Sequence, residues 1–471
     1  MKRILLLLFG FWVIQGISAQ NLEREMVYPD TLRSAKDSFY VNSPKFDRIW
    51  SFPITKLDTL NLGTSGYKGV SMTIWTDIDT LQIPHVNFPK NQHIKIPIVS
   101  PKDTAICILR FQDSPSDFTQ KYVIDKKGQI NFEIPEVYEL ANIALYLSEC
   151  SQKTRNHPET EYSRRVKEYF EPYKNHKLIQ VLNTNCVEAK YWNTYYGFRE
   201  NSICYSFDTD NFLQYNTPYK NVWWDNSGFY GGAFRNMLYL IQDFSQKSNF
   251  RKFYQENKAY YQGLIERQKE LLPIKQMWDW IEKEFPQRMD SYKIMFSPLI
   301  GGSHSTQRFY KGFFKEPEYQ ECIMFISSSE SIDSKSEYIE ELKEGLMSGI
   351  VFTEIDHNYV NPTSDLHIDQ IKSVFQDKDF WATKDAQQNY SSEYAIFNEY
   401  MTHSLFCLYI KETYGTEVAD DIIMDRVGLM NRRGYPKFEE FNTLLLDYME
   451  ANQTSVYDSY ADIVSLMKQI K

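Results

Sequence analysis

The 471-residue chain lacks several features that would assign it to a specialised class of protein. After the first twenty residues, no apolar run approaches the ~18–20 residues that a membrane-spanning helix needs. No C-x-x-C pair occurs, so a zinc site built from cysteines is not indicated. Internal repeats and low-complexity segments are also missing. We therefore expect a mature protein without a transmembrane segment, a cysteine zinc site or a repeat array.

Basic residues are too few for a nucleic-acid partner. The chain has 52 Lys and Arg against 62 Asp and Glu, a formal net charge of −10. Loss of Lys2 and Arg3 with a signal peptide would leave an even more acidic protein. Because neutralising phosphates requires a basic face, no nucleic-acid binding is expected.

The six cysteines are too few for a disulfide scaffold in a chain of this length. Cys107, Cys322 and Cys407 each lie in an apolar run and are predicted to be buried. Cys186 and Cys204 lie in a polar, aromatic region and are candidates for one disulfide.

The N-terminus has the three parts of a secretory signal peptide. Lys2 and Arg3 precede the apolar run ILLLLFGFWVI, and small residues follow up to Ala19. We predict a signal peptide over residues 1–19, cleaved after Ala19. The mature protein is expected to be periplasmic or secreted.

The remaining chain divides into a β-rich part and a mostly helical part. Residues 20–135 contain runs rich in Val, Ile, Thr and aromatics, which predict a β-rich, sandwich-like domain. The clearest strand predictions are 68–78, 93–100, 104–112, 121–128 and 129–135. Residues 136–471 have helical spacing of apolar residues, interrupted by a strand-like region around Gly301 and Gly302. The predicted class is α+β, with a small sheet in the helical domain.

The segment GIVFTEIDHNYVNP, residues 349–362, carries the most specific chemical signal. Its apolar spacing predicts a helix from about residue 336 to 357, ended by Pro362 or just before it. Glu354 and His357 are three residues apart and share one face of that helix. The H-E-x-x-H pattern of zinc hydrolases would place a histidine at Thr353.

A second predicted helix, residues 392–415, carries Glu399 and His403 four residues apart. If both faces turn inward, two carboxylates and two imidazoles meet, and these groups suit one zinc ion. With Thr353 too short to be a ligand, His403 or His304 is the candidate for the remaining position. His304 follows a pair of glycines, which allow the backbone to approach a site closely.

Each candidate residue has a chemical role if metal binds. Glu354 would be the general base, and His357 and Glu399 would be metal ligands together with His403 or His304. A cation or phenol should stabilise the developing oxyanion. The sequence does not rank the candidates for that role, which are Arg308, Tyr359, Arg432 and Arg433.

The same residues also fit ordinary structural roles. Glu354 with His357, and Glu399 with His403, match solvated ion pairs on helix surfaces, and His357 suits a helix C-terminus. The apolar neighbours of Glu399 argue against a wholly exposed second helix. His304 fits a loop histidine bonded to backbone.

The strings GIVFTEIDHNYVNP and PLIGGSHSTQRF and the helix around ELANI resemble an uncharacterised family of exported bacterial proteins. That family is similar to glutamate zincin metallopeptidases, and the resemblance covers the chain from about residue 136 onward. It implies a zincin-like fold in which Glu354, His357 and Glu399 match the base and two ligands. Thr353 departs from the first ligand.

The expected function is an exported zinc-dependent peptidase with an altered ligand set, holding one zinc ion and acting on a peptide or protein. The alternative is an inactive zincin-fold protein that binds a peptide or glycan. Its groove would be lined by the aromatic residues Trp192, Tyr195, Trp223, Trp224 and Tyr230.

Overall fold

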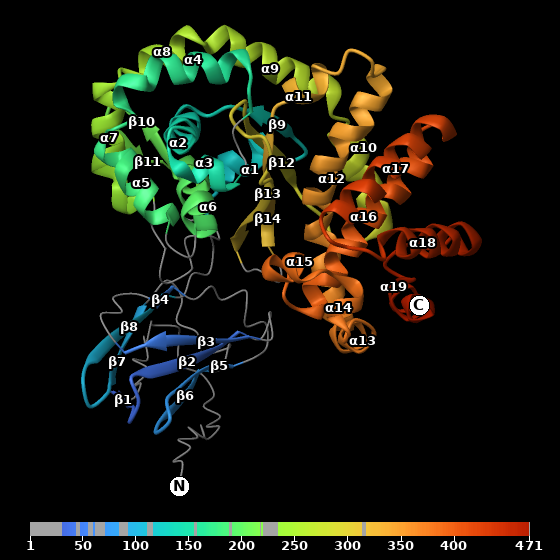
Figure 1. The fold of residues 1–471 in the computed structure, drawn as a ribbon, viewed down its shortest axis with the longest axis horizontal. Coiled ribbons are helices and arrows are strands. Elements are labelled where there is room, and N and C mark those ends of the chain that lie inside the picture. The colour runs from blue at the N-terminus through green and yellow to red at the C-terminus, as the bar shows by residue number, and fades with distance from the viewer. Residues whose placement is uncertain are drawn as a thin grey trace, which may run out of the picture. The chain divides into compact units, whose positions relative to one another are not determined.

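The computed structural model describes residues 31–43, 48–54, 60–61, 71–83, 93–110, 116–154, 158–187, 191–216, 218–219, 234–312 and 317–470. The predicted signal peptide lies outside these residues. The described chain forms two compact units, one up to residue 110 and one from residue 116. Figure 1 shows short strands in the first unit and many helices around a small sheet in the second.

The first unit consists of two four-stranded sheets. In one sheet the order is β1-β7-β8-β4, and in the other it is β3-β2-β5-β6. The strands are β1 (Leu32–Arg33), β2 (Ser38–Ser43), β3 (Arg48–Pro53), β4 (Leu60–Asn61), β5 (Met72–Trp75), β6 (Thr80–Ile83), β7 (His93–Val99) and β8 (Thr104–Arg110).

The alternation of buried and more exposed side chains along the strands explains how this unit forms its core. In β5 buried and half-buried positions alternate, as expected for a sheet with one covered face. Buried residues from both sheets join in one hydrophobic cluster, including Val41 and Ile74 of one sheet and Ile96, Ile98 and Cys107 of the other. The prediction that Cys107 is buried is confirmed.

The second unit contains a four-stranded sheet of order β13-β14-β12-β9. Strands β9, β12 and β14 are parallel, and β13 pairs antiparallel with β14. The bounds are β9 (Ile130–Glu133), β12 (Ser291–Ser297), β13 (Ser305–Gly312) and β14 (Pro317–Ser327). All seven residues of β12 are buried, as is typical of a parallel strand covered on both faces. A separate hairpin joins β10 (Tyr205–Phe207) to β11 (Leu213–Tyr215).

Ten helices of the second unit lie before β12 in the described sequence. They are α1 (Gln120–Lys126), α2 (Glu136–Tyr146), α3 (Glu149–Thr154), α4 (Glu161–Phe170), α5 (Lys177–Val187), α6 (Tyr191–Asn201), α7 (Leu238–Lys247), α8 (Phe250–Glu256), α9 (Lys258–Leu271) and α10 (Ile274–Glu284). Short 3₁₀ turns are η4 (Glu171–Tyr173), η5 (Ser202–Cys204) and η7 (Arg235–Met237).

The predicted strand at residues 121–128 is wrong, because this segment forms helix α1. Thr119 caps the helix by accepting a hydrogen bond from the Tyr122 backbone N–H. Gly128 then reverses the chain with a φ of 76°, a conformation that favours glycine. The helix buries none of its residues, so it had no clear apolar period for the sequence to show.

The remaining helices follow β14. They are α11 (Glu330–Asp333), α12 (Glu340–Ser364), α13 (Ile368–Val374), α14 (Lys378–Trp381), α15 (Lys384–Asn389), α16 (Glu393–Thr413), α17 (Thr416–Arg432), α18 (Phe438–Asn452) and α19 (Tyr460–Leu466), with 3₁₀ turns η8 (Asp365–His367) and η9 (Met467–Gln469). Helices α12, α16 and α17 pack against one another, in orange to red in Figure 1.

The fold class is α+β, mostly helical with small sheets, as the sequence predicts. The expectation that α12 ends at or before Pro362 is wrong, since the helix continues to Ser364 with the proline inside it. Buried Tyr359 and Val360 hold this last part in the core, and the Tyr394 hydroxyl donates to the Asn361 carbonyl. Among the described residues, no helix is long and apolar enough to cross a membrane.

One disulfide is present among the described cysteines, and it joins Cys150 to Cys186. The expected pairing of Cys186 with Cys204 is therefore wrong. Helices α3 and α5 pack together and bring Cys150 and Cys186 to a Cα–Cα distance of 5.3 Å. Cys204 lies outside this disulfide and is buried in the core against the sheet. Cys322 and Cys407 are buried, as predicted.

A buried carboxyl group links α2 to two other helices. The Tyr162 hydroxyl of α4 donates to Glu139 at 2.7 Å, and it also lies 2.7 Å from the Tyr261 hydroxyl of α9. Burial raises the pKa of Glu139 to about 7, although the bond from Tyr162 opposes this shift. The folded state therefore favours protonated Glu139, and its stability should fall as pH rises toward and through 7.

Glu139→Gln should remove this pH dependence. The neutral amide matches the protonated acid, so the variant should gain up to about 3 kcal/mol relative to the natural protein between pH 5 and pH 8. Urea unfolding at both pH values measures the difference. The exposed Glu149→Gln is the charge-matched control and should show no such gain. Parallel stability curves for Glu139→Gln and the natural protein would contradict the prediction.

Candidate functional site

Helix α12 presents the central segment of the site. Its buried side includes Val351, Phe352 and Ile355, while Glu354 and His357 are partly exposed on another side. Because residues three apart lie on one face of a helix, these two polar side chains are neighbours. The helix therefore fixes the acid and the imidazole on a rigid support.

Helix α16 supplies the second half of the site. The Ser392 side chain caps it by accepting from the Ala395 N–H. Glu399 and His403 are each 4% exposed and lie on the side toward α12 and α17. The expectation that this helix is not exposed is confirmed, and the polar pair is enclosed in the core.

Glu354 has an unusual environment for a carboxyl group. Burial, with the nearby carboxyl groups of Glu399 and Glu200, raises its pKa to about 8. Arg433 and Arg199 oppose the shift without cancelling it. Glu354 is thus largely protonated at neutral pH and still partly accessible.

The His357 ring lies between Glu399 of α16 and Asn361, one turn further along α12. Its Nε2 is 3.9 Å from Glu399 Oε1, and its Nδ1 is 3.4 Å from Asn361 Oδ1. Burial lowers the pKa of His357, although Glu399 opposes that shift. The side chain is 26% exposed, so a neutral imidazole faces accessible space.

Arg433, directly after α17, occupies the centre of the site. Its Nη2 donates to Glu399 Oε2 at 2.6 Å and to the Tyr390 hydroxyl at 3.3 Å. Its Nη1 lies 2.6 Å from His403 Nε2. One guanidinium thus contacts both polar side chains that α16 contributes, while its own side chain stays 33% exposed.

A second arginine reaches His403 from the opposite side. Arg426 Nη1 lies 2.9 Å from His403 Nδ1, so each ring nitrogen of this histidine faces an arginine. Burial and both arginines lower the pKa of His403 well below its usual value, which keeps the ring neutral. A neutral imidazole accepts at one nitrogen only, so one of the two contacts is a hydrogen bond.

Thr353 does not contribute to the polar centre. Its hydroxyl donates to the Gly349 carbonyl at 3.0 Å, which satisfies it within its own helix. Gly349 lies one turn earlier, where the absent side chain leaves room for the Arg426 guanidinium. Position 353, where the zinc-hydrolase pattern has a histidine, thus holds a threonine bonded within its own helix, and the Arg426 guanidinium packs one turn away at Gly349.

His304 lies at the border of the site. Burial, with Arg199 and Arg433, lowers its pKa to about 3, and its Nε2 has no hydrogen-bond partner among the described residues. The preceding Ser303 has a φ of 55°, and its carbonyl accepts from Arg199 at 3.0 Å. His304 is therefore near the arginines, and no contact joins it directly to His357 or Glu399 in the described part of the chain.

The remaining candidates lie in different surroundings. Tyr359 is buried, its hydroxyl 2.7 Å from that of Tyr292 and 3.2 Å from Glu282. Arg432 is exposed, and burial lowers the pKa of Arg308. Of the four oxyanion candidates, Arg433 is the one that contacts both Glu399 and His403.

Most of the aromatic residues predicted to line a groove lie outside the side chains that the structure describes. These are Trp192, Trp223, Trp224 and Tyr230. Tyr195 is buried, and its hydroxyl accepts from Arg199 at 3.1 Å. It supports the buried arginine.

The side chains present do not fit a zinc ion in this arrangement. Arg433 holds one oxygen of Glu399, and both nitrogens of His403 face arginines. His357 and Glu399 Oε1 are the remaining pair, whereas a zinc site needs at least three protein ligands. Among the described residues, no three His, Cys, Asp or Glu side chains are placed to hold a metal ion.

Several residues of the site were not predicted. Arg426, Tyr390 and the buried pair Arg199 and Glu200 all act on the candidate residues through contacts or charge. Arg199 and Glu200 stand near the end of the aromatic segment YWNTYYGFREN. Two adjacent charged residues in such a segment were a usable sign of a buried polar site. Arg426 lies among other charged residues in the sequence, so no local pattern marked it as part of the site.

Comparisons of the chain with protein-family models, with curated proteins and with solved structures find no match. The arrangement of the residues therefore carries the functional argument.

Gly349→Ala tests the close approach of Arg426 to α12. An added Cβ would collide with the Arg426 guanidinium and lie 2.8 Å from Phe406 Cζ. We expect a loss of about 1–3 kcal/mol from overpacking, measured by urea unfolding. Gly263→Ala in α9 is the control, because its Cβ would meet nothing within 4 Å. That variant should be stabilised by about 0.5–1 kcal/mol, and equal effects would refute the packing argument.

Proposed function

We propose that the second unit is a zincin-like domain that binds a peptide ligand without a metal ion. One observation carries this proposal: the Arg433 guanidinium contacts Glu399 and His403, the two residues that a metal would need from α16. The first unit, with its two sheets, is proposed to be a sandwich, and the whole protein to be exported.

The charge balance of the site supports an arginine in the place of a metal. Glu399 is 4% exposed, and an isolated carboxylate in such a place is costly. A guanidinium supplies a permanent positive charge and several N–H donors in a fixed plane. Arg433 thereby pairs with Glu399 and contacts His403, so these two side chains are already occupied. A ligand would bind to the other polar groups of the site, which remain accessible.

Three side chains of the site remain accessible to a ligand. Arg433 and His357 are 33% and 26% exposed, and Glu354 is partly exposed. They offer a cation, a neutral imidazole and a largely protonated acid, which can all bond to amide and carbonyl groups. We propose a peptide as the ligand because the sequence resembles glutamate zincins, which are peptidases.

A zinc-dependent hydrolase is the second candidate. The distance of 3.9 Å between His357 Nε2 and Glu399 Oε1 favours it, since two ligands of one ion lie at a similar separation. The raised pKa of Glu354 also favours it, because such carboxyl groups cluster at catalytic sites. This function would require Arg433 to leave Glu399.

A peptide library distinguishes the two candidates. Purified mature protein is mixed with random hexapeptides, with and without zinc, and bound and cleaved peptides are identified by mass spectrometry. We expect retention of a subset of peptides without cleavage in both conditions. Zinc-dependent cleavage that Glu354→Gln abolishes would support the hydrolase instead. Absence of both retention and cleavage would refute the proposed peptide binding.

A further inference from the structure

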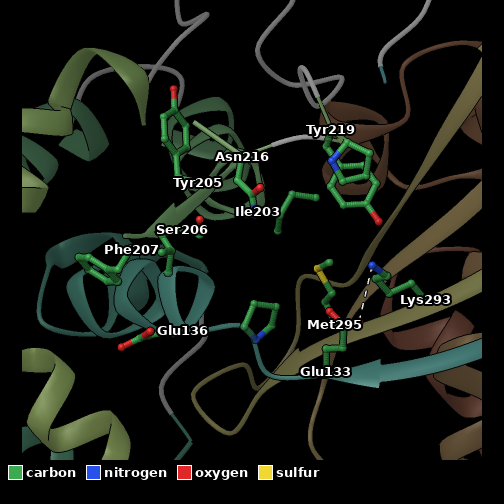
Figure 2. Close-up of a pocket in the computed structure, with 13 residues that line it drawn as sticks. Glu133, Glu136, Ile203, Tyr205, Ser206, Phe207, Asn216, Tyr219, Lys293 and Met295 are labelled. Carbon is green, nitrogen blue, oxygen red and sulfur yellow. Dashed lines mark ion pairs between the residues drawn. The ribbon is translucent and has the colours of Figure 1, made fainter. Parts of the chain in front are cut away.

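A cavity of about 260 Å³ lies against the sheet of the second unit, and none of its lining residues belongs to the site above. Its walls come from the end of β9, the start of α2, the β10–β11 hairpin and β12 (Figure 2). Apolar side chains form part of the lining, among them Ile203, Phe207 and Met295. The cavity is large enough for a molecule the size of an amino acid.

Lys293 gives this cavity a buried positive charge. The residue is 6% exposed, and its neighbours in β12 are buried as well. Its ammonium group lies 3.6 Å from Glu133 Oε1 and 3.4 Å from the Tyr122 hydroxyl. Both distances exceed the usual 2.7–3.2 Å of a hydrogen bond, and the group also lies over the Tyr219 ring at 5.2 Å. A buried ammonium with such long contacts has donors left for a ligand at the cavity wall.

Negative charge and a helix start lie in the same cavity. Glu133 is 38% exposed, and Figure 2 shows it paired with Lys293. Helix α2 begins at Glu136 after Pro135, without a side-chain cap, and the first N–H groups of a helix lack partners within it. Arg251 holds the Glu136 carboxylate at 2.9 Å. The cavity thus offers one cation and one carboxylate close together, with helix N–H groups nearby.

We propose that this cavity binds a free α-amino acid with an apolar side chain. The ammonium and carboxylate of an amino acid are adjacent, as are Lys293 and Glu133. The ligand carboxylate would pair with Lys293 and face the start of α2, and its ammonium would pair with Glu133. The side chain would lie against Ile203, Phe207 and Met295. A dianion is disfavoured, because Glu133 would repel its second charge.

Isothermal titration of the mature protein with leucine tests this proposal. L-leucine should bind, whereas N-acetyl-L-leucine and L-leucinamide should each bind at least ~10-fold more weakly, because each lacks one charge. Lys293→Met and Glu133→Gln should abolish or strongly weaken leucine binding. Lys247→Met, which removes an exposed lysine from α7, is the control and should leave binding unchanged.

Several results would overturn the proposal. One is no binding of leucine, methionine or phenylalanine at millimolar concentration. Another is equal binding of leucine and N-acetyl-leucine, which would mean that the ammonium is not recognised. If Lys293→Met does not fold, Glu133→Gln and the analogue series decide the question in folded protein. Unchanged leucine affinity in Glu133→Gln would also contradict the assignment.

Discussion

Arg433→Met is expected to destabilise the protein by about 2–4 kcal/mol, because it leaves the buried Glu399 carboxylate without its partner. The pair is held at 2.6 Å, and Glu399 is 4% exposed. The effect should lie toward the lower part of the range for buried pairs, since one third of the Arg433 side chain is exposed. Urea unfolding of the mature protein at pH 7 measures it.

Two further variants identify the cause of that loss. Arg432→Met removes the same charge from an exposed neighbour and should change stability by less than about 0.5 kcal/mol. Adding Glu399→Gln to Arg433→Met removes the unpaired charge, so the double variant should be more stable than Arg433→Met alone. If the double variant is no more stable, the Arg433–Glu399 pair is not what Arg433 contributes.

Loss of the Cys150–Cys186 disulfide should have an effect of similar size. The bond closes a loop with a sequence separation of 36, and constraining the unfolded chain over such a loop is worth about 3–4 kcal/mol. The variant with both cysteines changed to alanine should unfold at correspondingly lower urea concentration. Its circular dichroism in water should stay close to that of the natural protein.

Reduction provides the matching control. A reducing agent should lower the melting temperature of the natural protein and leave the double alanine variant unchanged. Cys204→Ala should not remove the response, because the disulfide joins Cys150 to Cys186 and does not include Cys204. A Cys204→Ala variant that no longer responds to reduction would contradict the observed pairing.

The long helices and central strands were predictable because each has a strong pattern of its own. The buried run in β12 and the helical spacing in α2, α10 and α12 show in the sequence directly. Helix α1 was missed because it buries none of its residues and depends on the Thr119 cap. The end of α12 was missed because tertiary packing of Tyr359 and Val360 outweighs the effect of Pro362.

The candidate site was predictable in part for the same reason. Spacing placed Glu354 with His357 and Glu399 with His403, and the structure brings His357 and His403 each within 4 Å of Glu399. Nothing local to residues 416–433 indicates that Arg426 and Arg433 turn inward from a neighbouring helix. Their positions depend on the close packing of α12, α16 and α17, which Gly349 permits.

Arg426 and Arg433 change the chemistry that the two Glu–His pairs of α12 and α16 can perform. A carboxylate and an imidazole near a metal are ligands, whereas the same groups beside a guanidinium form an ion-pair network. Glu354 would remain a proton carrier in either case, but a partly accessible, protonated acid is also a hydrogen-bond donor for a bound carbonyl group. Under the proposed function, the site binds its ligand as long as Arg433 stays on Glu399.

The most direct test of this account is the zinc content of purified mature protein, measured by mass spectrometry after dialysis against excess zinc and removal of free metal. The natural protein and His357→Ala should both contain well below one zinc ion per chain, because Arg433 holds the ligand groups. One zinc per chain in the natural protein, lost in His357→Ala, would contradict the account and establish a metal site.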